Sequence, residues 1–307
     1  MGIYENLEEF CGKPVVDFDP AKGIGDPSKR VPRVRIQWDE GPWEDRWRAF
    51  SQDSKIGDVQ ELIIGFWSGD DPEMGSAQVV QCLVEAAARM PKLKSLFVGD
   101  VTSEENEISW IYQTDLSPLL VAFPQLELLR ARGGNGLAIT APKHDRLKTL
   151  ILETGGLDRS IVQSLCKAKF PALEHLELWL GEENYGANVK ASDLTPILSG
   201  EVFPNLTYLG LCNSEIADEI AAAVADAPIL EKLEVLDLSK GTLSDDGCNA
   251  LLNFPLATRL KKLDIRHHYV SPACLARLEK AGITVDASDR AGDYEEGPED
   301  RYIFCGE

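Results

Sequence analysis

The segment LEVLDLSKGTLSDDGCNALL, residues 233–252, determines how the rest of the chain is interpreted. Its first six residues place leucines at the first, fourth and sixth positions, and the last of them alternate with polar residues. This alternation predicts a short strand whose fourth and sixth side chains face a core. The stretch SDDGCNALL that follows has apolar residues at helical spacing. The segment therefore predicts a strand followed by an amphipathic helix.

The same strand pattern, LxxLxL, recurs along most of the chain. An early copy, VQELII, starts at Val59 with one residue out of step. A proline often precedes the next strand and ends the helix before the chain turns back. Repeated strand–helix units predict an array in which each unit buries its apolar face against its neighbours. The regular copies begin at Leu93, Leu126, Leu147, Leu173, Leu206, Leu233 and Leu260.

These units resemble the leucine-rich-repeat family, with long helical units of the ribonuclease-inhibitor type, over roughly residues 59–285. The resemblance implies an α/β solenoid, a horseshoe with a parallel sheet on its concave side, helices on its convex side and about eight repeats. The stretches EISWIYQTDLSPLL, LEHLELWLG and NSEIADEIAAAVA make the whole chain similar to a leucine-rich-repeat family of actinomycete bacteria. This second resemblance implies no particular activity. Position nine of the repeat is usually Asn or Cys, but four units here have other residues at that position: Gly155, Ser214, Gly241 and His268.

The chain divides into three parts. Residues 1–58 are expected to form an N-terminal cap of one strand (RVRIQWDE) and one helix, which covers the apolar end of the array at 59–285. Trp43, Trp47 and Phe50 recur at helical spacing, so we expect them to pack against the array; ligand stacking is the alternative. The acidic tail, 286–307, is expected to be solvated. Docking of its apolar end on the core, or a role in self-inhibition or partner binding, is the alternative.

Composition excludes several classes of partner. The 307 residues carry 31 basic and 51 acidic groups, and the net charge of −20 repels nucleic acids and anionic membranes. Apolar stretches are too short to span a bilayer, and the first residues show neither a basic leader nor an apolar signal core, so we expect no secretory signal. Seven scattered cysteines without a CxxC motif favour reduced thiols in the cytoplasm. We expect a cytoplasmic monomer.

Sequence motifs for catalysis, cofactors or metals are missing. There is no GxxxxGK[ST], GxGxxG, HExxH or GxSxG pattern, so we expect no catalytic residue, no cofactor and no metal. The adjacent histidines His267 and His268 would point to opposite faces of a strand, which disfavours a shared metal ion. Cys212 is expected on the outward face of its strand, without the neighbouring base that a catalytic cysteine needs.

The strand register predicts a binding surface. If positions four and six face the core, positions three, five and seven face the concave side. Row seven consists of Gly65, Gly99, Arg132, Glu153, Trp179, Cys212, Ser239 and Arg266. Exposed tryptophan, tyrosine and arginine are frequent binding anchors, and they gather in the middle of the array. The predicted concave-face site comprises Arg130, Arg132, Glu153, His175, Glu177, Trp179 and Tyr208.

The two arginines in this site have alternative roles. They could receive a ligand carboxylate, or they could pair with Glu153 and Glu177. Intramolecular pairing is the favoured interpretation for the free protein. The insertions DVTSEENEISWIYQ and GEENYGANVKAS should project from one edge of the array. A second candidate surface at this edge comprises Trp110, Tyr112 and Tyr185, although these aromatic side chains could simply pack the loops.

These features predict a non-enzymatic scaffold that binds a protein or peptide with its concave face and the edge carrying the insertions. The alternative is a small-molecule-binding protein or enzyme with a pocket between the insertions and the central strands. In that case Glu153, Glu177 and His175 would be the acid–base groups. A purely structural scaffold is a third possibility.

Overall fold

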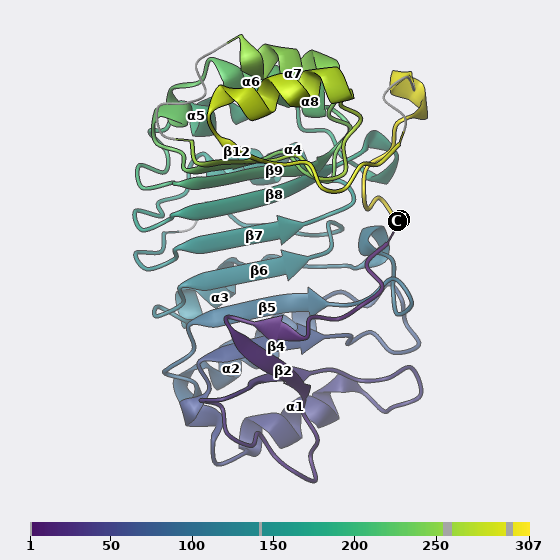
Figure 1. The fold of residues 1–307 in the computed structure, drawn as a ribbon. Coiled ribbons are helices and arrows are strands. Elements are labelled where there is room, and N and C mark those ends of the chain that lie inside the picture. Colours follow the sequence, from purple (N-terminus) through teal and green to yellow (C-terminus); the bar gives the residue numbers. More distant parts are fainter. Residues whose placement is uncertain (1, 141–142, 254–259, 293–296) are drawn as a thin grey trace.

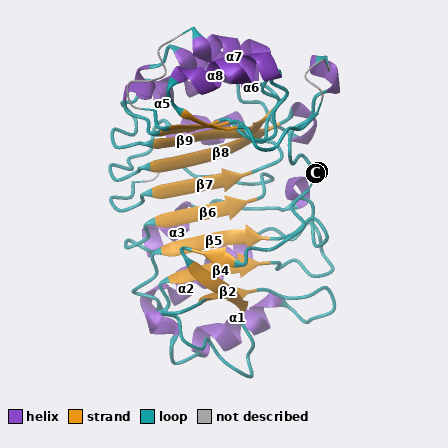
Figure 2. Ribbon diagram, in the orientation of Figure 1, coloured by secondary structure: helices purple, strands orange, loops and turns teal. Residues whose placement is uncertain are grey.

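The computed structural model describes residues 2–140, 143–253, 260–292 and 297–307. Twelve strands form one sheet, and their order in the sheet follows the chain from β1 to β12. Only the β1–β2 pair is antiparallel, and the other described pairs are parallel. The helices behind the central strands lie on one face (Figure 1), and secondary-structure colouring separates these layers (Figure 2). This mixed α/β arrangement is consistent with a repeat solenoid.

Each repeat copy enters the sheet at its third position, as the pattern predicts. The register aligns position three with position three, as in His175 beside Tyr208, and position five with position five, as in Arg130 beside Ile151. The strands are β1 Glu9–Phe10, β2 Lys13–Asp17, β3 Val31–Val34, β4 Glu61–Gly65, β5 Ser95–Asp100, β6 Leu128–Arg132, β7 Thr149–Glu153, β8 His175–Gly181, β9 Tyr208–Ser214, β10 Val235–Asp237, β11 Lys262–Asp264 and β12 Thr284–Asp286.

The helices bury one apolar side against the sheet. Side chains at positions four and six, such as Leu176 and Leu178, are fully buried in the same core. Ser244 and Ser271 cap two helices by accepting hydrogen bonds from backbone N–H groups, which satisfies donors in their first turns. The helices are α1 Trp43–Gln52, α2 Ala77–Ala86, α3 Ser117–Ala122, α4 Arg159–Leu165, α5 Thr195–Leu198, α6 Ala217–Ala225, α7 Asp245–Leu252 and α8 Pro272–Leu278. None of the helices in the described ranges is both long and apolar enough to cross a bilayer.

At or just beyond the ends of several strands, one residue lies in the left-handed backbone region. Gly133 has φ +111°, Asn213 +52°, Lys240 +68° and His267 +59°. Glycine and asparagine adopt this conformation readily, whereas lysine does so at a cost. The backbone amides of these residues reach the next unit, as in Lys240 N–H to the carbonyl oxygen of Arg266 at 2.7 Å. The position of each strand exit is therefore fixed by backbone contacts between units.

The predicted seventh row is wrong at one residue. Gly65 pairs with Asp100 and not with Gly99, because the register shifts by one residue between β4 and β5. Gly99 has φ +101°, and a Cβ there would lie only 2.6 Å from the carbonyl oxygen of Arg132. Glycine at this point allows an extra residue in the strand. Asp100 therefore takes the place in the row where the sequence pattern had put Gly99.

The N-terminal region contains more strands than expected. A hairpin of β1 and β2 precedes β3, and β3 pairs in parallel with β4. Burial of Trp43, Trp47 and Phe50 in the main core confirms that they are packing residues. The helix that carries them thus closes one end of the apolar core.

The expectation of a solvated tail is wrong for its last residues. Ile303 and Cys305 are buried, and the Phe304 N–H donates to the carbonyl oxygen of Lys240 at 2.8 Å. Asn213 holds the backbone of Cys305 through two hydrogen bonds, of 2.6 and 2.9 Å. The apolar end of the tail docks because it finds a hydrophobic cluster at the strand exits, which includes Ile108. Residues 293–296 of the acidic run lie outside the described residues.

Candidate binding site on the open face of the sheet

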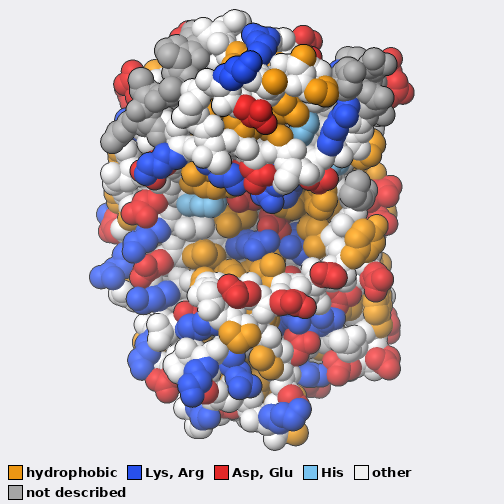
Figure 3. Space-filling view, in the orientation of Figure 1, with side chains coloured by type: hydrophobic (Ala, Val, Ile, Leu, Met, Phe, Trp, Pro, Cys, Tyr) orange, Lys and Arg blue, Asp and Glu red, His pale blue; other side chains and the backbone are white. Residues whose placement is uncertain are grey.

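A hollow of about 630 Å³ lies on the open face of the sheet, the face opposite the helices. We call it the central hollow. It is seen as a recess with cationic and apolar side chains in the middle of this face (Figure 3). Its volume is within the range of about 300–1,000 Å³ that is typical of ligand sites. The lining residues from the sheet and the strand exits are Arg130, Arg132, Ile151, Glu153, Glu177, Trp179 and Lys240.

The two terminal segments of the chain contribute the remaining walls. Gly2, Ile3, Tyr4, Glu5 and Leu7 line one side, and Phe304 lines another. Two hydrogen bonds hold the N-terminal segment beside β5. The N–H of Ser103 donates to the carbonyl oxygen of Ile3, and the side chain of Asn6 donates to the carbonyl oxygen of Asp100. The segment runs across the strands toward the C-terminus, as Figure 1 shows.

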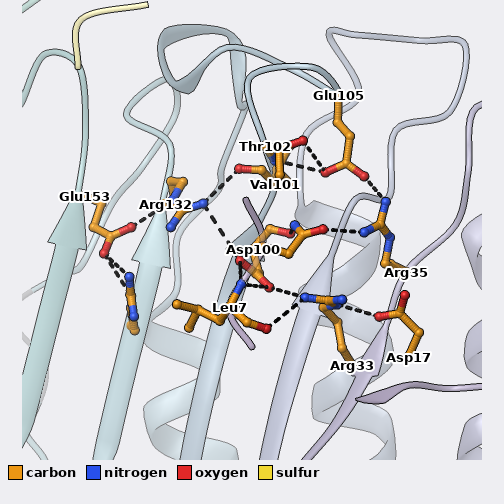
Figure 4. Close-up of polar contacts among 12 residues, drawn as sticks. Leu7, Asp17, Arg33, Arg35, Asp100, Val101, Thr102, Glu105, Arg132 and Glu153 are labelled. Atoms are coloured by element: carbon orange, nitrogen blue, oxygen red, sulfur yellow. Dashed lines mark hydrogen bonds and ion pairs between the residues drawn. The ribbon is translucent and has the colours of Figure 1, made fainter. Parts of the chain in front are cut away.

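Charged residues of alternating sign, from five strands between β2 and β7, form a series beside the hollow. Arg33 Nη1 lies 2.8 Å from Asp100 Oδ2, and Arg132 Nη1 lies 3.9 Å from Asp100 Oδ1. Arg132 Nε is 2.7 Å from one oxygen of Glu153, whose other oxygen is 2.7 Å from Arg130 Nε. Figure 4 shows Asp100 between Arg33 and Arg132, and the backbone N–H of Leu7 donates to the same carboxylate. We call this series the ion ladder; its members are Asp17, Arg33, Asp100, Arg132, Glu153 and Arg130.

The expected pairing of the arginines is confirmed for Glu153 but not for Glu177. Arg132 and Glu153 are almost fully buried, whereas the side chain of Arg130 keeps 20% exposure. Both guanidinium groups lie over the ring of Phe97, at 4.4 and 5.3 Å from its centre. Arg132 is therefore a structural residue of the ion ladder, and Arg130 is the more accessible of the two arginines.

Glu177 belongs to a second polar cluster. Trp179 Nε1 donates to its Oε1 at 2.7 Å, and His175 Nε2 lies 3.5 Å from its Oε2. Burial would raise the pKa of Glu177, but the neighbouring His175 ring and the hydrogen bond from Trp179 outweigh it and lower that pKa. Glu177 is therefore a carboxylate at neutral pH and not a general acid. With Glu153 bound by two arginines, the geometry gives little support to acid–base catalysis by this pair.

His175 and Tyr208 lie beside the hollow but do not line it. Their rings stack with centres 3.7 Å apart. The Tyr208 hydroxyl donates to Asp237 at 2.6 Å, and burial followed by the negative charge of Asp237 raises the tyrosine pKa. The stacked pair therefore packs next to Glu177.

Trp179 faces outward from its strand, as predicted, yet it is mostly covered. It packs with Ile108 and with Cys212 and Cys305, and its ring meets the edge of Phe304. The terminal segment and the first insertion supply this cover, which a strand map alone does not include.

Burial raises the pKa of Cys212 well above its ordinary value, so its thiol stays protonated.

The predicted aromatics at the insertion edge are distributed differently. None of Trp110, Tyr112 and Tyr185 is among the described residues that line the central hollow. Trp110 is 49% exposed, and Tyr112 lines a small separate cavity next to Trp67. The pKa of Tyr185 is raised to about 12 by burial and by its hydrogen bond to Glu307. Tyr185 thus packs against the C-terminal segment.

Lys240 is a lining residue that the strand pattern missed. It lies beyond the end of β10, in the left-handed turn, and is half-buried. Its ammonium group is 5.1 Å from the centre of the Trp179 ring and 3.3 Å from Ser239 Oγ. The sequence signal was a lysine at a strand exit where other units have Gly133 or Asn213.

His267 contacts the docked tail and is expected to make the stability of the protein depend on pH. Its Nε2 lies 3.1 Å from the carbonyl oxygen of Tyr302, and burial lowers its pKa. The unfolded chain, with a histidine pKa of about 6.5, therefore binds more protons than the folded chain just below that pH. We expect stability to fall as the pH is lowered from about 6.5 toward the folded pKa, and to be unaffected by this residue above it. Urea unfolding across this window measures the effect.

The matched variant is His267→Asn, because asparagine tolerates the left-handed backbone and does not titrate. Its free energy of unfolding should change less steeply with pH in the same window. An unchanged slope would show that His267 is not the group responsible.

The fold and the hollow together define a protein of repeated strand–helix units with a recess on the open face of a long, mostly parallel sheet. No family model matches the chain, and no curated protein matches its sequence. A similar solved structure is a protein from Bacteroides fragilis, determined by the Northeast Structural Genomics Consortium. It superposes with a TM-score of 0.80 at 30% identity, over 89% of this chain and 76% of that chain. The chain belongs to the same family as this Bacteroides fragilis protein.

Proposed function

We propose that the protein is a leucine-rich-repeat solenoid that binds a segment of a protein or peptide on its open, concave face and catalyses no reaction itself. The observation that carries the proposal is the central hollow, which combines apolar walls with cationic side chains. Its apolar contacts include Ile151 and Trp179 from the sheet and Phe304 from the tail. Such a mixture of aromatic, aliphatic and arginine side chains is typical of binding anchors.

The repeat assignment is supported by the register. Copies of LxxLxL from Leu93 to Leu260 occupy neighbouring strands, with equivalent positions side by side. Concave faces of such arrays are extended binding surfaces. The net charge of −20 favours a partner that is basic overall, because long-range attraction speeds encounter.

A substitution that fills the hollow tests the proposal. Ile151→Trp adds a large side chain to the floor, where Ile151 is partly exposed on β7. The matched control is Val121→Trp, because Val121 on helix α3 is 80% exposed and does not line the hollow. The wild type and the control should retain the same partner from extracts of the native host, whereas Ile151→Trp should lose at least tenfold in affinity, or about 1.4 kcal/mol. Retention by Ile151→Trp at wild-type affinity would contradict the proposal.

A small-molecule ligand is the second candidate, and the volume of about 630 Å³ is the observation that favours it. A thermal-shift screen with a metabolite library separates the two. A ligand that raises the melting temperature of the wild type, but not of Glu177→Gln, would support this second candidate.

A further inference from the structure

We propose that the central hollow is a carboxylate-binding site in which Lys240, assisted by Arg130, receives one carboxylate of a peptide ligand. The inference rests on the proposed function and specifies which group of the partner enters the hollow. Lys240 and Arg130 both line it, from the exit of β10 and from β6 respectively. Neither a strand motif nor the resemblance to a repeat family assigns such a role to Lys240.

No carboxylate of the described residues makes direct contact with the ammonium group of Lys240. Among the described residues lining the hollow, Arg130 and Arg132 form ion pairs, while Lys240 has no carboxylate within ion-pair distance. Its contacts in the described ranges are a long hydrogen bond to Ser239 and the face of Trp179. The pKa of Lys240 is raised above its ordinary value despite burial, because Cys212, Asp237 and Glu177 all favour the ammonium form. The ammonium therefore keeps its positive charge while it faces the hollow.

The buried acids of the hollow are already occupied. Glu153 is bound by two arginines, and Glu177 accepts a hydrogen bond from Trp179 and lies next to His175. A cationic ligand that reached either of these two acids would have to displace one of these contacts in a partly desolvated place, and the other lining acid, Glu5, is exposed to solvent. An anionic ligand needs no such displacement, because Lys240 has no ion-pair partner among the described residues. Charge complementarity thus favours a carboxylate.

The backbone holds Lys240 in place before any ligand arrives. Its left-handed conformation is fixed by its own N–H bond to Arg266 and by the N–H of Phe304, which donates to its carbonyl oxygen. A lysine rarely occupies such a turn, and costly backbone conformations persist where surrounding contacts enforce them, often at functional sites. The C-terminal segment therefore both forms a wall of the hollow and positions its free cation.

The carboxylate has two sources, the α-carboxylate at the end of a peptide and the side chain of Asp or Glu. Four pools of short N-acetylated peptides separate them: acid-ended or amide-ended, each with or without Asp and Glu. Binding is measured by affinity selection on the full chain followed by mass spectrometry. We expect retention only from pools that contain a carboxylate. If the amide-ended pool with Asp and Glu is still retained, the carboxylate comes from a side chain. If only the acid-ended pools are retained, it is the α-carboxylate.

The peptides retained by the wild type are then titrated against Lys240→Met, which keeps the aliphatic stem, and against Lys240→Arg, which keeps the charge. We expect at least a tenfold loss for Lys240→Met and most of the affinity kept in Lys240→Arg. Equal retention of the carboxylate-free pool would overturn the inference and leave the proposed function standing, and that comparison needs no variant. Wild-type affinity in a folded Lys240→Met would also overturn it. No retention from any pool would overturn the proposed function itself.

Discussion

Replacement of Arg132 by methionine is expected to lower the free energy of unfolding by about 3–5 kcal/mol, because it removes a buried cation that two buried carboxylates share and leaves each of them with a single arginine. Arg132 lies between Asp100 and Glu153, and the three side chains are almost completely buried. It also donates from Nη1 to the carbonyl oxygen of Val101 at 2.8 Å. Urea unfolding, monitored by circular dichroism, measures the change.

Arg130→Met is the matched control for this prediction. It removes the other partner of Glu153, but Arg130 is partly exposed and Glu153 keeps Arg132. We expect a smaller loss, of about 1 kcal/mol. The double variant Arg132→Met/Glu153→Met should be more stable than Arg132→Met alone, because it also removes the buried carboxylate that Arg132→Met leaves with only the partly exposed Arg130. Equal effects of Arg132→Met and Arg130→Met would contradict the role given to the ion ladder.

Replacement of Asn213 by alanine is expected to cost about 2–4 kcal/mol and to release the C-terminal segment. The Asn213 side chain donates to the carbonyl oxygens of Cys305 and Thr154 and accepts from the Cys305 N–H. Alanine removes these bonds and also places a less tolerant residue at φ +52°. Limited proteolysis should then cut near Tyr302, and urea unfolding gives the loss of stability.

Asn213→Gly separates the two contributions. Glycine accepts the left-handed backbone but cannot hold Cys305, so it should expose the tail to protease while costing less stability than alanine. A tail that stays protected in both variants would mean that the burial of Ile303 and Cys305, and not Asn213, holds it.

The periodic sequence pattern predicted the sheet because each unit repeats the same spacing of apolar residues. Leucines at positions four and six leave only one face free, so the order of strands and the rows through Arg130 and Glu177 followed directly. The predicted row of position seven is wrong at Gly99, where one extra residue in β5 shifts the register. Such a bulge depends on contacts with the neighbouring strand, and the pattern of apolar residues in one strand does not reveal it.

The site was less predictable than the sheet, because parts of it come from outside the repeats. Ile3 and Phe304 belong to segments with no periodic pattern, and both reach the cluster around Trp179 from opposite ends of the described chain. Burial of Trp179 thus depends on long-range contacts. Lys240 was missed because only positions three, five and seven were predicted to face the concave side, and Lys240 is at position eight of its unit. The sequence predicted the accessible arginine, Arg130, but not the cation that lies next to Trp179.

Titration of one indole signal tests the central claim most directly. The N–H of Trp179 donates to Glu177 at the edge of the hollow, whereas Trp110 is exposed on the first insertion. The signals are assigned with Trp179→Phe and Trp110→Phe, and a carboxylate peptide retained by the wild type is added to ¹⁵N-labelled protein. Ligand in the central hollow should shift the Trp179 signal and leave that of Trp110 in place. A shift of Trp110 alone would place the ligand at the insertion edge and contradict the account.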